Sequence, residues 1–434
     1  MSKGGERYPH TVPLALKFPQ SGRVIDSGDQ LNRRMLLTYI VLLAFSMSLI
    51  PYTIDPYLPA FPAMGEFFGV PNGTIQASLA GVTLGLSIGQ LFAGPLSDAF
   101  GRRPLLLIAS FGFAVSAISL FFVTEITMFI VLRFAMGFFA ASADVVARAV
   151  VRDLYRGQPM LKMLSRIYLI ASLSPILGPI IGSQLVGLFE WQGIFLTFGF
   201  FGLALAIAST FFLVETLPKA QRRSSTPLGL ARGYVSVLKD RVYVGLLIFG
   251  AIQLGALFGY LNVVPYLYQD VFGMSPQDFG VWFALNSFAL YLGVQFGGVM
   301  AKFFSAQWML VVYAAVGTLA GLLLILSSGT NLWFAETGFI VVVFVFGASV
   351  TTLPTIALLN HGSEAGTAAS LMGVSNFALA SAMAGIYAGL STSTTFDVGV
   401  LIAICFGISL LSVVFIVRPW SIPDLREPIE EPKH

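Results

Sequence analysis

The sequence predicts an all-α integral membrane protein with twelve transmembrane helices in two pseudo-symmetric six-helix halves. Hydrophobic residues make up 56% of the 434 positions and charged residues only 10%. Soluble domains carry roughly 25% charged residues. The apolar residues also gather in runs of ~20, the length at which a helix crosses the hydrocarbon core of a bilayer. Short polar breaks separate these runs.

Twelve runs are long enough to span a membrane. They cover residues 36–58, 75–96, 104–123, 127–149, 164–188, 193–214, 242–265, 277–300, 308–328, 332–353, 367–390 and 397–417. The longest internal polar stretch is basic and separates the sixth run from the seventh. We therefore expect a linker over 215–241 between the halves 35–214 and 242–417, with polar tails at 1–34 and 418–434. The first tail does not read as a signal peptide, because no apolar segment with a small-residue cleavage site follows its basic residues.

Lysine and arginine mark one side of the membrane. The turns after spans 1, 3, 5, 7, 9 and 11 contain neither residue. Of the 24 basic residues, all but Arg133 and Arg148 lie in the tails, in the other turns or at the adjoining span ends. Because positive residues stay on the cytoplasmic side, this pattern predicts a multi-pass protein of the cell membrane with both termini cytoplasmic.

The composition argues against an enzyme and against a metal site. Cys405 is the single cysteine, and the three histidines lie in polar stretches outside the apolar runs. The runs contain no paired carboxylates at helical spacing, and no phosphate-binding loop is present. We expect no metal, no cofactor and no nucleic-acid partner.

Several short motifs fall at matching places along the spans. Residues 94–103 read GPLSDAFGRR, residues 133–137 read RFAMG, and residues 174–183 read SPILGPIIGS. The chain also contains TIDPYLPAFPAM, VVRDLY and AGTAASLMG. Together these resemble the drug:proton antiporters of the major facilitator superfamily, and within them the Bcr/CflA-type multidrug exporters, including the chloramphenicol type. The resemblance covers residues 36–417 and departs from the span 5 motif at Ser183.

This resemblance implies a proton-coupled exporter of small lipophilic or amphipathic compounds, antibiotics among them, that works by alternating access. The bilayer, the substrate and protons would be its partners, the proton its only coupling ion, and the monomer its working form. The alternative is an exporter of a specific metabolite, an amino acid derivative or a sugar, on the same fold.

Asp55 and Arg133 are charged residues inside spans, where each charge costs at least ~2.5–3.5 kcal/mol. Asp55 lies about 21 residues, roughly 31 Å of helix, beyond Arg34. Arg133 lies about six residues, roughly 9 Å, below the start of the fourth span. The two are therefore expected at a similar level, as a proton-coupling pair. The alternatives are a wetted helix-end aspartate and a structural arginine.

Asp144 and Arg148 are four residues apart on one helix face, where opposite charges can pair. The pair either neutralises itself near the cytoplasmic end, or Asp144 is a second proton-coupling or substrate carboxylate. The spacing is compatible with both alternatives.

Two motif regions carry expectations of their own. The cytoplasmic charges either only fix the topology or, as the resemblance implies, form a latch, and their members are Asp98, Arg102, Arg103, Arg152 and Asp153. The span 5 motif either bends its helix or, as the resemblance implies, seals the cavity, and its members are Gly178, Pro179 and Gly182.

Polar groups inside spans are costly when they face lipid, so some must line a central cavity. The candidates are Tyr52, Asn262, Tyr266, Asn286 and Asn376. Apolar walls with a few hydrogen-bonding groups suit a lipophilic ligand.

Overall fold

The structure is a computed structural model that describes residues 25, 27–222, 233–326, 331–357, 365–390 and 394–422. In these residues the chain is helical throughout, apart from short turns and one backbone bridge between Ile25 and Glu215. The first group of helices comprises α1 (Arg33–Ile54), η2 (Asp55–Ala60), α2 (Phe61–Phe68), α3 (Asn72–Phe100), α4 (Arg102–Phe121), α5 (Ile126–Leu154), α6 (Gly157–Ala171) and α7 (Ser174–Phe212). The second comprises α9 (Arg241–Tyr266), η4 (Leu267–Val271), α10 (Pro276–Met300), α11 (Ala306–Leu326), α12 (Leu332–Ala357), α13 (Ala365–Leu390), α14 (Thr395–Leu411) and η5 (Ser412–Val417). Three short 3₁₀ turns lie outside these groups: η1 (Gly28–Gln30), η3 (Lys219–Gln221) and η6 (Pro419–Ser421).

Eleven helical stretches of the described chain are long and apolar enough to cross a membrane. One of them, Gly157–Phe212, carries two predicted spans, 164–188 and 193–214. Its helix changes direction where Phe189 and Glu190 leave helical geometry, Glu190 with a φ of 58°. Each of the twelve predicted spans thus overlaps a helix of the described chain, although the end of the run 308–328 lies outside the described residues. The all-α prediction is confirmed for the described residues.

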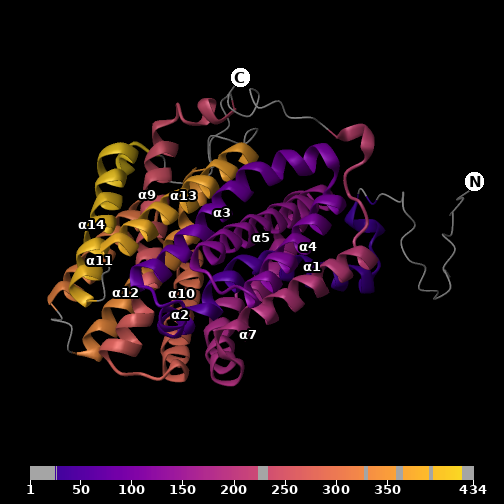
Figure 1. The fold of residues 1–434 in the computed structure, drawn as a ribbon. Helices are drawn as coiled ribbons and strands as arrows, with labels where there is room; N and C mark the ends of the chain where they lie inside the picture. The colour runs from indigo at the N-terminus through magenta and orange to yellow at the C-terminus, as the bar shows by residue number, and fades with distance from the viewer. Residues whose placement is uncertain are drawn as a thin grey trace, which may run out of the picture.

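The helices form two groups that pack side by side (Figure 1). Within the first, α5 packs against α1, α3 and α4, and α7 packs against α4. Within the second, α10 packs on α12, α11 on α14, and α9 on α13. The groups meet where α3 lies along α13 and where α7 lies along α10. We call the end at which α1 begins and η5 ends the base, and the opposite end the apex.

Acidic residues in the apical turns stabilise helix starts. Glu125 accepts a hydrogen bond from the backbone of Thr127 at the first turn of α5. Ser275 and Asp278 form a reciprocal capping box on α10. A carboxylate near a helix N-terminus meets unpaired N–H groups and the positive end of the helix dipole. The acids of these turns thus have a local structural reason to be there.

Small residues let α3 and α5 approach closely. A Cβ on Gly85 would overlap the backbone carbonyl of Phe134, and one on Gly137 would overlap that of Val82. Close backbone approach supplies dispersion contacts that apolar side chains facing lipid do not provide.

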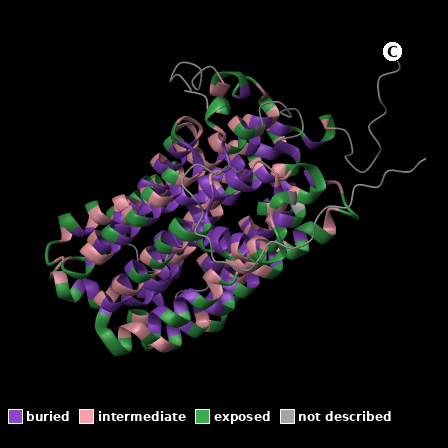
Figure 2. Cartoon of the chain, turned by 90° about the vertical axis from the view of Figure 1, so that its right-hand side faces the viewer, coloured by how far each residue is buried: buried purple, intermediate pink, exposed green. Residues whose placement is uncertain are grey.

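Large apolar side chains cover the outer faces of the bundle. Figure 2 shows exposed residues along the outer sides of the helices and buried residues between them. The exposed set includes Phe92, Phe111, Phe200, Val312 and Leu319. An apolar surface of this extent is unfavourable in water and suits the hydrocarbon of a bilayer.

Candidate functional site

A cavity of about 200 Å³ lies between the two groups of helices. Its polar wall residues are Asp55 from η2, Tyr260 from α9, and Asn286 and Ser287 from α10. The rest of the wall is apolar: Ile50, Pro51, Ile54, Pro175, Leu254, Leu257, Phe258, Leu261, Phe283, Leu290, Val343 and Phe377. Because both groups contribute to it, any motion of one group against the other changes its shape.

Asp55 lies where α1 changes to the tighter helix η2. Pro56 and Pro59 interrupt the hydrogen-bonding pattern here, because proline has no backbone N–H. Asp55 is only 7% exposed, and it forms part of the cavity wall. In the described part of the chain its carboxylate has no ion-pair or hydrogen-bond partner. The alternative of a wetted residue at a helix end does not describe this environment.

The glycines of the span 5 motif hold this segment in place. A Cβ on Gly182 would overlap the backbone carbonyl oxygen of Pro56, and one on Gly178 would lie 3.3 Å from the Cβ of Asp55. On another side the same stretch meets α10, because a Cβ on Gly280 would lie 2.9 Å from the carbonyl oxygen of Pro179. The motif therefore packs against both the acidic segment and the opposite group of helices.

Arg133 is completely buried on α5. Its Nη1 donates to the carbonyl oxygen of Thr53 at 2.8 Å. In a 3₁₀ turn that carbonyl would accept from residue 56, which is a proline, so the arginine supplies the missing donor. The guanidinium carbon also lies 3.8 Å from the centre of the Tyr57 ring and 5.6 Å from that of Phe195. Such a stacked, desolvated cation–π contact contributes up to ~2 kcal/mol.

Asp55 and Arg133 lie at the same level, as the helix arithmetic predicts, but they do not form an ion pair in this structure. Arg133 contacts the residues two before and two after Asp55, whereas the aspartate side chain faces α7 and the cavity. The side chain's direction depends on the change from α-helix to 3₁₀ helix at Asp55.

Asp144 and Arg148 pair with each other on α5, with 2.8 Å between Oδ2 and Nη2. Asp144 is buried and the Arg148 side chain is 51% exposed. The geometry is that of the self-neutralising alternative, and neither residue lines the cavity.

A second buried acid, Glu336 on α12, was not among the predicted site residues. It is 3% exposed. Its Oε1 accepts from Nδ2 of Asn286 at 2.8 Å, and its Oε2 accepts from the hydroxyl of Tyr268. The available sequence signal was an acid four residues inside the apolar run 332–353, close enough to the polar break to resemble an ordinary helix-end residue.

The five predicted cavity residues are distributed over three environments. Asn286 lines the cavity. Tyr52 packs on Phe198 and Phe201 with ring centres 4.7 and 4.8 Å away, and lies outside the wall. Asn376 is also outside the wall, and its Oδ1 has no partner among the described residues. Asn262 and Tyr266 instead join the two groups of helices.

Neutral hydrogen bonds close the apex between the groups. Gln76 donates to the carbonyl of Asn262 at 3.0 Å, and Tyr266 donates to that of Asn72 at 3.3 Å. Further bonds run from Gln269 to the carbonyl of Pro59 at 3.1 Å and from Gln277 to that of Ser183 at 3.2 Å. Deeper in the bundle, Ser381 donates to the carbonyl of Ala80 at 2.8 Å and Ser87 to that of Val374 at 2.9 Å.

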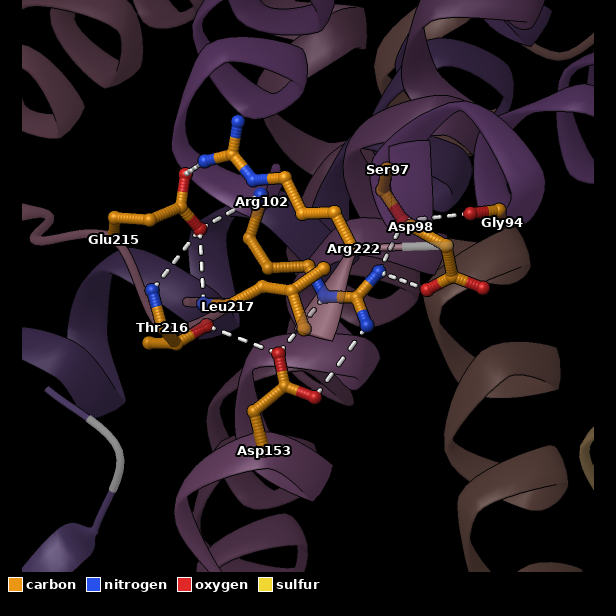
Figure 3. Close-up of polar contacts among 9 residues, drawn as sticks. All are labelled: Gly94, Ser97, Asp98, Arg102, Asp153, Glu215, Thr216, Leu217 and Arg222. Atoms are coloured by element: carbon orange, nitrogen blue, oxygen red, sulfur yellow. Dashed lines mark hydrogen bonds and ion pairs between the residues drawn. The ribbon is translucent and has the colours of Figure 1, made fainter. Parts of the chain in front are cut away.

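Arg102 organises a charge cluster at the base (Figure 3). Its Nη1 donates to Asp98 at 2.5 Å and to the hydroxyl of Ser97 at 2.6 Å, and its Nε donates to Asp153 at 2.8 Å. Three of the five predicted latch residues are thus in contact. Arg103 instead donates to the carbonyl of Thr210 at 2.8 Å. Arg152, outside the cluster, lines a basal hollow of about 620 Å³ together with Asp153.

The start of the interhelical linker completes the cluster. Glu215 accepts from the backbone N–H of Arg102 at 2.9 Å and pairs with Arg222 at 3.3 Å. Gly101 has a φ of 103°, and a Cβ there would run into the side chains of Glu215 and Arg222. Neither Glu215 nor Arg222 was among the predicted site residues, although Glu215 follows directly on the sixth span.

No group of three or more histidine, cysteine, aspartate or glutamate residues suited to a metal occurs in the part of the chain that the structure describes.

A family model described as Major Facilitator Superfamily matches residues 35–385. The chain belongs to the major facilitator superfamily. Its helical fold with two six-helix halves and its predicted family are thereby confirmed. A member of this superfamily is a membrane-embedded transporter of small molecules, so the prediction that the protein is not an enzyme is confirmed as well.

Two of the three relatives described next are named for drug resistance. The chain is 30% identical to the "Bicyclomycin resistance protein homolog" of Haemophilus influenzae, over 89% of this chain and 97% of that protein. It is 27% identical to "Multidrug resistance protein MdtL" of Klebsiella pneumoniae, over 88% and 97%. A third relative, the "Uncharacterized MFS-type transporter YdgK" of Bacillus subtilis, is 32% identical over 81% and 88%.

Solved structures agree on the fold. The partially occluded, inward-open xylose transporter XylE from E. coli superposes with a TM-score of 0.69 at 13% identity, over 91% of this chain and 99% of that one. The human organic anion transporter MFSD10 gives a TM-score of 0.58 at 20% identity, over 89% and 100%.

Proposed function

We propose that the protein is a proton-coupled exporter of small lipophilic or amphipathic compounds, antibiotics among them. The observation that carries this proposal is the Asp55 carboxylate, buried at a cavity shared by both halves without a cationic partner in the described chain. A carboxylate in such a place is costly when charged and inexpensive when protonated. It therefore suits a group that binds a proton in one conformation and releases it in another.

Alternating access supplies the two conformations. With the cavity open to the outside, Asp55 binds a proton. With the cavity open to the cytoplasm, a lipophilic compound enters the apolar wall, and the proton leaves. Because one cavity serves both ligands in turn, inward proton flow drives outward export. Arg133 holds the Asp55 segment through Thr53 and Tyr57 without neutralising the acid.

The apolar wall and the drug-resistance names of two relatives support this substrate class. Few polar groups line the cavity, so a ligand gains most from burying apolar surface there. We propose that the proton is the coupling ion, that no cofactor takes part, and that one chain suffices for transport.

The charge distribution supports an orientation in a bacterial cell membrane in which the base lies on the cytoplasmic side. The basal cluster around Arg102 then acts as the cytoplasmic latch, since it ties the start of α4 to the end of α5 and to the linker. Both termini are on that side in this orientation.

Drug susceptibility tests the proposal. Cells that lack their own drug exporters would express the wild type, Asp55→Asn or Glu66→Gln. Glu66→Gln is the control, because it alters an exposed apical acid. We expect the wild type and Glu66→Gln to raise the inhibitory concentration of at least one lipophilic compound, and Asp55→Asn to abolish the increase. Protection by Asp55→Asn equal to that of the wild type would refute the role of Asp55. Export confined to one metabolite would establish the alternative substrate class.

A further inference from the structure

A second acid faces the cavity region from the other half of the molecule. Both oxygens of Glu336 accept hydrogen bonds, from Asn286 on α10 and from Tyr268 on η4. The titratable groups facing it in the described chain are Tyr260 on α9 and Tyr268. None of the described residues packed against it carries a positive charge.

Two neutral donors do not cancel the cost of a buried negative charge. The idealised cost of moving a carboxylate from water into a low-dielectric interior is of order 20 kcal/mol, and two hydrogen bonds to a charged group together return only about 3–6 kcal/mol. The charged and neutral forms of Glu336 are therefore closer in free energy than those of a carboxylate in water. Such a group can change its protonation state when its surroundings change.

The hydrogen-bond partners of Glu336 accommodate both protonation states without moving their heavy atoms. The Tyr268 hydroxyl donates to a carboxylate oxygen, and after rotation about its C–O bond it accepts from a carboxylic acid O–H. Asn286 donates to the other oxygen in either case. The site thus preserves its hydrogen bonds when a proton is gained or lost.

The site is also connected to the cavity. Asn286 forms part of the cavity wall and contacts Glu336 directly. Tyr260 is also part of that wall, with a buried hydroxyl that has no partner in the described chain. This hydroxyl is within electrostatic range of both Glu336 and Asp55. The two acids therefore flank one cavity, one from each half.

We propose that Glu336 is a second proton-binding site, placed in the C-terminal half and reached from the cavity past Asn286 and Tyr260. This inference rests on the proposed proton-coupled export and extends it. Asp55 and Glu336 each bind a proton, so the transporter carries up to two protons per cycle, one on each half.

Infrared difference spectroscopy on the purified full-length protein in lipid tests the site without a substrate. The carboxylic acid C=O stretch would be followed through a pH titration of the wild type, Glu336→Gln, Asp55→Asn and Glu66→Gln. We expect Glu336→Gln to remove one pH-dependent band that the other two variants retain, and Asp55→Asn to remove another. Identical pH-dependent bands in the wild type and Glu336→Gln would overturn the proposal.

A second variant covers the case in which Glu336→Gln does not fold. Tyr268→Phe removes one donor to the charged form, so the Glu336 band should appear at a higher pH. A band unmoved by Tyr268→Phe would count against the site. Failure here is distinct from failure of the proposed function, because coupled transport in vesicles would still require Asp55. Conversely, a titrating Glu336 in a protein that moves no protons with substrate would overturn the function only.

Discussion

The two halves bury an acid in different ways. In the N-terminal half, Asp55 lies on a proline-interrupted turn and has no hydrogen-bond partner in the described chain. In the C-terminal half, Glu336 lies within a regular helix and uses both oxygens. The first acid is held through the residues around it, since Gly182 packs on the carbonyl of Pro56 and Arg133 donates to that of Thr53. The second acid is held by its own side chain. The same chemical group can therefore be a poor or a good contributor to stability, depending on what surrounds it.

Truncating each acid tests this difference most directly. Glu336→Ala leaves the Tyr268 hydroxyl and one N–H of Asn286 without acceptors, although Nδ2 of Asn286 keeps its bond to the carbonyl of Trp282. Each buried unpaired donor costs about 1–3 kcal/mol. For the two donors together, we expect the free energy of unfolding to fall by about 2–6 kcal/mol. Asp55→Ala removes no hydrogen bond within the described chain, so its change should stay within about 1 kcal/mol.

Thermal unfolding of the purified variants in one detergent gives the comparison. Glu336→Gln serves as the control, because an amide of the same shape can accept from one partner and donate to the other. Equal losses for the two alanine variants would remove the distinction between the acids.

Gly182→Ala tests the backbone contact that positions Asp55. The added Cβ would overlap the carbonyl oxygen of Pro56, a main-chain atom that can move only with its helix. Overpacking of this kind costs about 1–3 kcal/mol. We expect a loss of that size in stability, together with weakened drug resistance.

Gly94→Ala is the matched control, because a Cβ at Gly94 meets nothing within 4 Å. Gly178→Ala should fall between the two, since its Cβ would be 3.2 Å from a proline ring carbon. A Gly182→Ala protein as stable and active as Gly94→Ala would show that η2 and α7 are not held together by this contact.

Arg133→Lys should lower stability less than Glu336→Ala or Gly182→Ala. The charge and its burial remain, but the planar contact with the Tyr57 ring is lost. We expect stability to fall by about 1–2 kcal/mol, the range of a buried cation–π contact. Arg148→Lys keeps its ion pair with Asp144 at a half-exposed site and should change stability by less than about 0.5 kcal/mol. Indistinguishable unfolding temperatures for the two lysine variants would argue against stacking by Arg133.

Apolar run length and charge placement were enough to predict the spans, because the bilayer imposes a length and a polarity on each crossing. The similar depth of Asp55 and Arg133 in the bundle also followed from the rise per residue of an α-helix. The directions of the two side chains did not follow from it. Pro56 and Pro59 place Asp55 in the tighter helix η2, where its side chain faces α7 and the cavity. Motif residues such as Arg102 were predicted because neighbours along the chain supply part of their contacts.

The cavity residues were harder to predict. Of the five candidates, Asn286 lines the cavity and the other four do not. Which side of a helix faces the cavity depends on neighbours that are distant in sequence, so the sequence pattern alone could not separate them. Glu336 illustrates the same limit. Its partners are 50 and 68 positions away, and without them a buried acid cannot be distinguished from one at a wet helix end.

The six hydrogen bonds described above between the halves share one form that matters over evolutionary time. In each of them, a neutral side chain donates to a main-chain carbonyl of the other half. A main-chain acceptor persists whichever amino acid occupies its position. Half of each contact is thus immune to substitution, and none of them responds to salt. The residues that supply these carbonyls can therefore change in the course of evolution while the hydrogen bonds between the halves persist.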